Sequence, residues 1–137
     1  TKKVIGDIVY YQDHEHQLGI EVKLGTIRLT KGEFNTWIVN TDKLYWPHTF
    51  IAIGTNGIAL CSWSTFRKSY ITAVKVQKKD PDWEPVELTD GYGPQKSVNE
   101  LLTFLPKDNC HLKGYTNFQS IQLEKQFMLA LKKEIES

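Results

Sequence analysis

Three charged side chains near the start of the chain have the types and the spacing that phosphodiester hydrolysis requires. Asp7 lies in a hydrophobic run, and fourteen positions later Glu21 and Lys23 stand two residues apart in a second one. Two converging carboxylates can hold a hard cation such as Mg²⁺, which takes oxygen ligands. Such a cation polarises a phosphate and activates a water molecule. A lysine beside it can position or deprotonate that water, or stabilise charge in the transition state.

The elements that must position these side chains are two β-strands joined by a short turn. Residues 4–11 are rich in β-branched and aromatic types, and residues 18–24 alternate apolar with other side chains. A period of two places Glu21 and Lys23 on one face of the second strand and the apolar set on the other. We expect the two runs to pair as an antiparallel hairpin around a polar turn over residues 12–17.

This arrangement resembles the PD-(D/E)xK nucleases, and within them the archaeal Holliday-junction resolvases and several restriction enzymes. In that family an acidic residue, often after Pro, opens the second core strand, and an Asp/Glu-x-Lys motif lies on the third. Here Gly6 stands where Pro is common. The resemblance implies that Asp7 and Glu21 are metal ligands, that the backbone carbonyl of Val22 is a further ligand, and that Lys23 is the catalytic lysine.

The resemblance covers residues 4–63 and implies a restriction-endonuclease-like α/β (α+β) fold, with a mixed β-sheet flanked by helices. It implies a Mg²⁺- or Mn²⁺-dependent DNA endonuclease of the restriction or junction-resolving type, acting as a homodimer or in a larger assembly. Two alternatives stay open: a catalytically inactive module of this fold that binds nucleic acid, and an α+β protein-interaction or immunity factor. A Glu-x-Lys pair also occurs by chance on solvated strand faces.

The sequence departs from the family pattern in one respect. Most members carry a helix before the first core strand, often with a further carboxylate, and no such helix precedes residue 4. The sequence begins with Thr1 rather than Met. We expect either a chain cut from a longer protein or a C-terminal helix, over residues 117–136, that packs in this place. Glu124 would then be an extra carboxylate; a core-packing helix with solvated charges is the alternative.

A second acidic stretch could be mistaken for a metal site. The run from Asp13 to His16 reads Asp-His-Glu-His, but it falls in the predicted turn and no third histidine is near it in sequence. A polar turn is therefore favoured over a metal cluster. Asp13 is also an alternative to Asp7 as the first ligand, and its place in a turn disfavours it.

Helical and strand patterns continue beyond the hairpin. Thr30 and Glu33 have the spacing of a capping box, which predicts a helix that buries residues 34, 37 and 38. Residues 49–53 and 58–63 are predicted paired strands, joined where Asn56-Gly57 supplies positive φ angles. A further strand is predicted over residues 70–77 and a loop over 79–94. Ser97 and Glu100 predict a capped helix through residue 105.

Three tryptophans and one tyrosine could stack on bases, and they fall into two groups. Trp37 and Trp63 fall on apolar patterns and are predicted core residues. Tyr45 and Trp46 precede a proline in a connection, so we expect them at the surface, where they could stack on bases. Cys61 is expected to be a free buried thiol in an intracellular protein, cytoplasmic or nucleoid-associated.

Size and charge fit one globular domain that contacts nucleic acid locally. The 137 residues suffice for one core, which we divide into a strand-rich, nuclease-like part (1–78) and a helical C-terminal region (95–137). No apolar run is long enough for a membrane span. The formal net charge of +1 is weak for a DNA-binding protein. The distribution of charge matters more, and the predicted phosphate contacts lie in local basic clusters: Arg28, Lys31, Arg67 and Lys68. A solvated surface is the alternative interpretation for each cluster.

Overall fold

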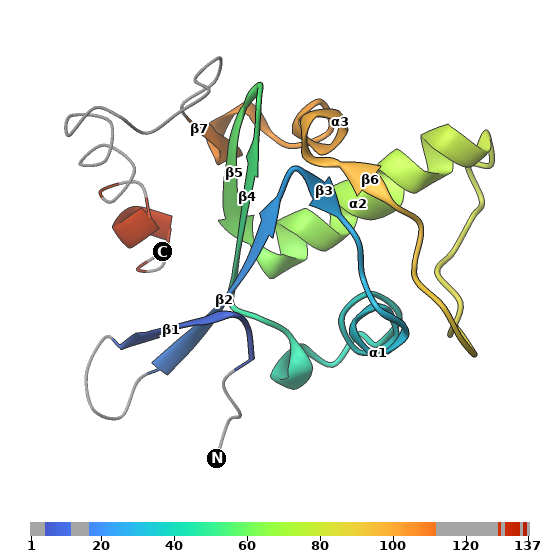
Figure 1. Ribbon diagram of the computed structural model, residues 1–137, viewed down its shortest axis with the longest axis horizontal. Coiled ribbons are helices and arrows are strands. Elements are labelled where there is room, and N and C mark those ends of the chain that lie inside the picture. The colour runs from blue at the N-terminus through green and yellow to red at the C-terminus, as the bar shows by residue number, and fades with distance from the viewer. Residues whose placement is uncertain (1–4, 12–16, 112–128, 130, 135, 137) are drawn as a thin grey trace.

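A mixed β-sheet with helices on both of its faces forms the centre of the molecule (Figure 1). The structure, a computed structural model, describes residues 5–11, 17–111, 129, 131–134 and 136. Its main sheet has the strand order β1-β2-β4-β5-β7, in which β2 and β4 are parallel and the other neighbours are antiparallel. The strands are β1 (Ile8–Tyr11), β2 (Gln17–Leu24), β4 (Thr49–Gly54), β5 (Gly57–Ser62) and β7 (Cys110–His111). The predicted mixed α and β class is confirmed.

The β1–β2 hairpin is confirmed and depends on a close approach of two backbone segments. Its register runs from Ile8 opposite Ile20 to Tyr11 opposite Gln17. A Cβ atom on Gly19 would lie 1.7 Å from the carbonyl oxygen of Ile5. No side chain fits there, so glycine lets the segment before β1 lie directly against β2. The turn was predicted over residues 12–17; Gln17 is instead the first residue of β2, and residues 12–16 lie outside the described residues.

The crossover from β2 to β4 is helical, as a parallel pair of strands requires. It contains β3 (Thr26–Ile27), α1 (Lys31–Phe34), the π-helical segment η1 (Asn35–Val39) and the 3₁₀ turn η2 (Lys43–Tyr45). The predicted capping box is confirmed, because Thr30 and Glu33 each accept the other's backbone N–H with a side-chain oxygen. The side chains predicted to be buried here are in the core: Phe34, Trp37 and Ile38.

The β4–β5 hairpin is also confirmed, although its turn differs from the predicted one. Gly54 pairs with Gly57, so Thr55 and Asn56 form the connection. Gly57 has a φ of 149°, but Asn56 does not take a positive φ, so this part of the prediction is wrong. The physical reason is a side chain from another element. Asn99 accepts from the N–H of Asn56 at 3.0 Å and donates to the Thr55 hydroxyl at 2.7 Å.

The strand predicted over residues 70–77 is wrong, because this segment lies in the sixteen-residue helix α2 (Trp63–Lys78). Ser62 ends β5 and caps the first turn of the helix with its hydroxyl. Side chains four residues apart are fully buried: Phe66, Tyr70 and Val74. That spacing belongs to one face of a helix. The β-branched residues of the segment favoured a strand, but the packing of its apolar face against the sheet stabilises the helix and outweighs that preference.

The aromatic residues form the densest part of the core. Trp37 and Trp63 are buried as predicted, with ring centroids 5.3 Å apart. Tyr45 is exposed as predicted, but the prediction for Trp46 is wrong, because only 8% of it is exposed. The Trp46 indole N–H donates to the carbonyl of Asn40 at 2.9 Å, which satisfies its polar atom inside the fold.

The loop after α2 leads to a small second sheet. β6 (Lys96–Ser97) pairs antiparallel with β3, and α3 (Val98–Leu102) follows directly. The helix ends three residues earlier than predicted. The N–H of Val98 donates to the carbonyl of Gly25, which fixes this unit to the chain just after β2.

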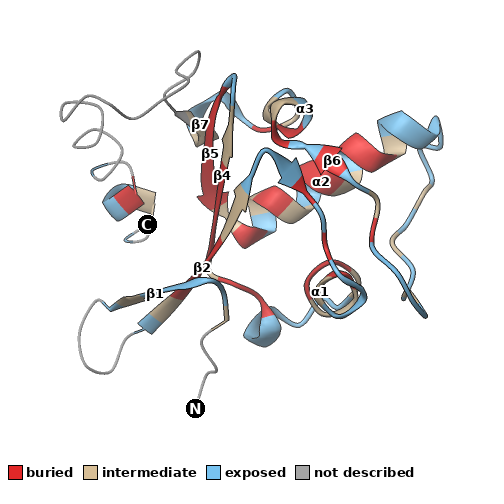
Figure 2. Cartoon of the chain, viewed as in Figure 1, coloured by how far each residue is buried: buried red, intermediate tan, exposed pale blue. Residues whose placement is uncertain are grey.

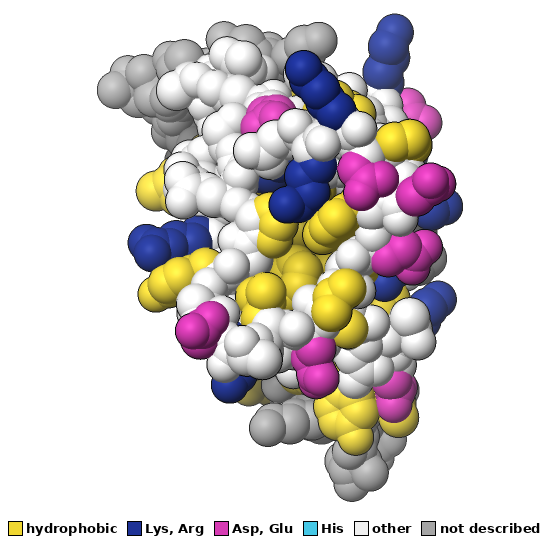
Figure 3. Space-filling model, turned by 90° about the vertical axis from the view of Figure 1, so that its right-hand side faces the viewer, with side chains coloured by type: hydrophobic (Ala, Val, Ile, Leu, Met, Phe, Trp, Pro, Cys, Tyr) yellow, Lys and Arg dark blue, Asp and Glu magenta, His cyan; other side chains and the backbone are white. Residues whose placement is uncertain are grey.

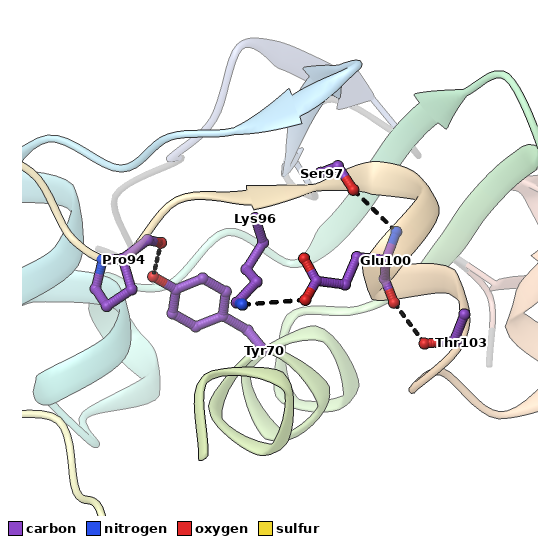
Figure 4. Close-up of polar contacts among 6 residues, drawn as sticks. All are labelled: Tyr70, Pro94, Lys96, Ser97, Glu100 and Thr103. Carbon is purple, nitrogen blue, oxygen red and sulfur yellow. Dashed lines mark hydrogen bonds and ion pairs between the residues drawn. The ribbon is translucent and has the colours of Figure 1, made fainter. Parts of the chain in front are cut away.

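A buried lysine anchors α3 (Figure 4). Lys96 is 1% exposed, and its ammonium lies 3.1 Å from a carboxylate oxygen of Glu100. The Ser97 hydroxyl accepts from the N–H of Glu100, which is one half of the predicted capping box. The carboxylate of Glu100 binds the Lys96 ammonium and does not accept the backbone N–H of Ser97, which would be the second half of a capping box. In Figure 4, the Tyr70 ring lies beside the lysine chain, and its hydroxyl donates to Pro94.

Two hydrophobic clusters lie on opposite faces of the sheet (Figure 2). The larger one joins β4 and β5 to the crossover, to α2 and to α3, and therefore draws on residues from 27 to 105. The smaller one contains Ile20, Ile51, Ile58 and Leu60, with Leu131 packed against them. Residues 129, 131–134 and 136 are helical, in agreement with the predicted C-terminal helix. The rest of that helix, including Glu124, lies outside the described residues.

The surface and the thiols add three observations. Figure 3 shows one face on which hydrophobic side chains gather at the centre, with acidic side chains along one side. Cys61 is a free, buried thiol, as predicted. Within the part of the chain that the structure describes, no helix combines the length and the apolar character needed to cross a membrane.

Candidate metal centre

Asp7 lies immediately before β1 and is held by the backbone of β2. Its carboxylate oxygen Oδ2 accepts from the N–H of Val22 at 2.9 Å. Gly6 has a φ of 138°, and a Cβ on it would lie 2.7 Å from the backbone of Ile20. Glycine therefore allows the chain to cross closely over β2 just before the carboxylate. Asp7 was predicted to be the first residue of the strand. In the structure it lies one position before β1.

Glu21 occupies the middle of the sheet. It lies on β2 between β1 and β4, opposite Phe50 of β4. Residues opposite each other in adjacent strands share a face, so Glu21 lies on the same face as the aromatic core. Only 2% of Glu21 is exposed. The alternative of a solvated strand face is therefore wrong for this residue, since a buried carboxylate requires a compensating partner.

Lys23 supplies that partner. Its ammonium lies 3.2 Å from the Oε2 atom of Glu21, and 15% of the lysine side chain is exposed. The period of two had predicted that both side chains share a face of β2, and the ion pair confirms this. The lysine spans from the buried carboxylate towards the surface, because its aliphatic stem lies along the core and its head remains partly in contact with solvent.

The electrostatics of the pair are dominated by burial. Loss of solvation raises the pKa of Glu21 to about 7, although the charge of Lys23 and its hydrogen bond act in the opposite direction. The charge of Asp7 and a hydrogen bond between the two carboxyl groups raise it further. Near neutral pH, Glu21 is therefore present in both its protonated and its ionised form.

These groups bring together oxygen atoms of the kind that bind divalent cations. Within a strand, the N–H and C=O of one residue point towards the same side. The N–H of Val22 points to Asp7, so its carbonyl lies on the same side of β2. Two carboxylates and one carbonyl are hard ligands that suit Mg²⁺ or Mn²⁺, with water completing the shell. Across residues 5–11, 17–111 and the described part of the C-terminus, no group of three His, Cys, Asp or Glu side chains is positioned for a metal ion.

The position of the acidic run from Asp13 to His16 relative to this site is not described. Residues 13–16 fall in the gap between β1 and β2, outside the described residues. The choice of Asp7 over Asp13 therefore stays a prediction. The hydrogen bond of Asp7 to β2 supports it.

The four predicted DNA-contact residues have different environments. The Arg28 guanidinium lies 3.9 Å from the centroid of the Tyr92 ring, and Lys31 is exposed at the start of α1. Arg67 is half-buried, its Nε donates to the carbonyl of Ile38 at 2.7 Å, and burial lowers its pKa. These contacts give Arg67 a structural role. Lys68, the next residue, is exposed.

Two features near these residues were not predicted from the sequence. Gly19 makes the close approach that places Asp7, and a lone glycine in a strand pattern does not reveal its neighbour. A row of hydroxyl side chains on α2 was hidden because the segment had been predicted in part as a strand. Its period of four would have shown one helical face.

Comparison with known proteins gives no family. No family model matches the chain, and no curated protein or solved structure matches it.

Proposed function

We propose that the chain is a metal-dependent nuclease that hydrolyses DNA phosphodiesters, with a restriction-endonuclease-like fold. The observation that carries the proposal is the contact of two carboxyl groups, Asp7 and Glu21, with the Lys23 ammonium bound to the second of them. A buried acid of raised pKa beside a second acid and a lysine is a candidate for a functional site.

Each side chain has a distinct task in the proposed reaction. The Asp7 and Glu21 carboxylates and the Val22 carbonyl would hold a Mg²⁺ or Mn²⁺ ion, which supplies Lewis-acid activation of the phosphate and of water. Glu21 would have to be ionised to act as a ligand. The Lys23 ammonium lies next to that carboxylate, and it would face the phosphate oxygens and stabilise the negative charge that develops during attack.

A second candidate is a non-catalytic module with the same site and fold. The hydrogen bond from the Arg67 guanidinium to the carbonyl of Ile38 favours this second candidate, because a guanidinium bonded within the protein is less accessible to a phosphate. The near-neutral net charge also favours it. Such a module would hold a cation, or the ion pair alone, for stability.

The test is nicking of a supercoiled plasmid, with Mg²⁺, Mn²⁺ or EDTA. We expect cleavage with either ion and none with EDTA. Glu21→Gln should reduce the rate by at least about 10²-fold, the scale of losing one electrostatic or acid–base group. The matched control is Glu87→Gln, an exposed glutamate in the loop after α2, which should cut like the parent. Equal cleavage by Glu21→Gln and parent would exclude this active site.

A further inference from the structure

A groove lies between α2 and the segment that follows α3. It has a volume of about 300 Å³. Five of its lining residues come from α2 and two from the segment after α3: Ser64, Thr65, Lys68, Ser69, Thr72, Phe104 and Pro106. We call this the α2 groove. None of these residues belongs to the candidate metal centre.

The helix places its polar side chains on one line. Residues 64 and 65, 68 and 69, and 72 follow one another at four-residue steps, which lie on one face of a helix. The core-facing side chains of α2 fall between these steps. The groove therefore collects four hydroxyls and one ammonium over about two turns.

Two of the four hydroxyls, those of Thr65 and Thr72, make hydrogen bonds within the fold. Thr65 accepts from the Ser62 hydroxyl, and Thr72 donates to the Lys68 carbonyl. The Ser69 side chain, in contrast, has no hydrogen-bond partner among the described residues, although Ser69 is only 5% exposed. No fully buried polar atom in the described structure lacks a partner. The Ser69 oxygen must therefore reach the groove, where a ligand or water can bond to it.

The charge of the groove is positive. Lys68 is its one ionisable lining residue, and no described acidic residue forms an ion pair with it. An ammonium and free hydroxyl donors together bind an oxyanion, and lysine commonly binds phosphate. Phe104 and Pro106 form an apolar wall beside these donors. The ligand thus needs an anionic part and an apolar part.

We propose that the α2 groove binds a small phosphorylated molecule, whose phosphate contacts Lys68 and Ser69 and whose apolar part packs on Phe104. The volume is at the lower end for ligand sites, which fits a compact molecule. A nucleic-acid backbone would need a row of cations along the groove, and its lining offers one. The inference is independent of the proposed nuclease activity.

The test is a titration of the full chain with phenyl phosphate, followed by amide chemical shifts. We expect saturable shifts at residues 64–72 and 104, and at least tenfold weaker binding for Lys68→Gln, the scale of one lost charge-assisted hydrogen bond. Ser69→Ala should also weaken binding and keep the thermal stability of the parent. Lys78→Gln, on the same helix outside the groove, should bind like the parent. Phenol, which lacks the phosphate, should not bind, and inorganic phosphate should bind more weakly.

Three results would overturn the assignment. The first is equal binding by Lys68→Gln and the parent. The second is shifts that lie outside the groove or do not saturate. The third is a DNA oligonucleotide that shifts these amides when phenyl phosphate does not, which would make the groove part of a nucleic-acid surface.

Discussion

The carboxylate of Asp7 and the backbone N–H of Val22 are joined by a 2.9 Å hydrogen bond across fifteen residues of sequence. The regular pairing of β1 with β2 begins only at Ile8, so this side chain extends the hairpin by one bond. The same bond holds Asp7 next to Glu21, on the following strand. The candidate site and this edge of the sheet therefore share a hydrogen bond, so a substitution that disturbs one should also disturb the other.

The raised pKa of Glu21 predicts how stability depends on pH. Between its ordinary value of 4.5 and about 7, the folded protein binds a proton at Glu21 that the unfolded chain has lost. The free energy of unfolding should therefore fall as pH rises through this range, by up to about 3 kcal/mol. Glu21→Gln should remove this decline in urea unfolding with EDTA present, whereas Glu87→Gln should keep it. Parallel curves for Glu21→Gln and the parent would contradict the raised pKa.

Gly19 should be essential to the hairpin. A methyl group in Gly19→Ala would overlap the carbonyl oxygen of Ile5, so the segment carrying Asp7 must move away. We expect a loss of about 1–3 kcal/mol, the cost of overpacking, with weaker metal binding by calorimetry. Gly32→Ala is the matched control, because Gly32 lies in α1 and nothing lies within 4 Å of an added Cβ. It should stabilise the protein slightly, by about 0.4–1 kcal/mol. Equal effects of the two changes would refute the contact.

Lys96 and Glu100 should respond differently to removal. Glu100→Ala leaves a buried ammonium without its carboxylate, so we expect a loss of about 1–3 kcal/mol in the free energy of unfolding. Lys96→Met keeps the aliphatic chain and removes the charge, so it should cost less or even stabilise. Chemical denaturation measures both. If Lys96→Met costs more than Glu100→Ala, the ammonium has a further partner that stabilises the fold.

The salt dependence of DNA binding should distinguish Lys31 from Arg67, two of the four predicted DNA-contact residues. Lys31→Ala should reduce the log–log slope of affinity against salt by about one, if its ammonium contacts a phosphate. Arg67→Ala should leave the slope unchanged and lower thermal stability, because its guanidinium bonds to Ile38. Filter binding to a DNA duplex at several salt concentrations measures the slope. An equal slope change for both variants would mean that Arg67 leaves its internal bond on DNA.

Local patterns in the sequence predicted most of the elements around the site. The alternation around Glu21 placed the glutamate and Lys23 on one face, because side-chain direction in a strand depends only on the period. Capping residues similarly predicted α1 and the start of α3, since their hydrogen bonds lie within one turn. These predictions needed no knowledge of distant residues.

The failures all depended on tertiary contacts. The helix α2 resembled a strand in composition, and its packing on the sheet overrode that preference. Trp46 is buried because Asn40 and Arg67 lie around it, and neither contact follows from its position before a proline. The burial of Glu21 also depends on distant segments, since it lies opposite Phe50 of β4, on the face of the sheet that the aromatic core covers. Pairings between distant strands cannot be derived from spacing alone.

The last prediction separates metal binding from turnover at the candidate site. Glu21→Gln and Asp7→Asn each damage a ligand, so both should need more metal for cleavage and bind Mn²⁺ more weakly. Lys23→Ala spares both carboxylates, so it should bind metal and DNA nearly as well as the parent and turn over at least about 10²-fold more slowly. Single-turnover cleavage across a range of Mn²⁺ concentrations distinguishes the variants that bind metal weakly from the variant that binds metal but turns over slowly.

Two controls decide the assignment of the first ligand. Asp13→Asn should cut like the parent, because we assign the first ligand to Asp7, which bonds to β2. Lys43→Ala, an exposed lysine of η2, is the matched control for Lys23→Ala. If Asp13→Asn is inactive and Asp7→Asn is active, the nuclease proposal stands with Asp13 as the ligand. If the Asp7, Glu21 and Lys23 variants all cut at the parent rate, the three side chains form an ion-pair cluster of the fold, and the active site must lie elsewhere.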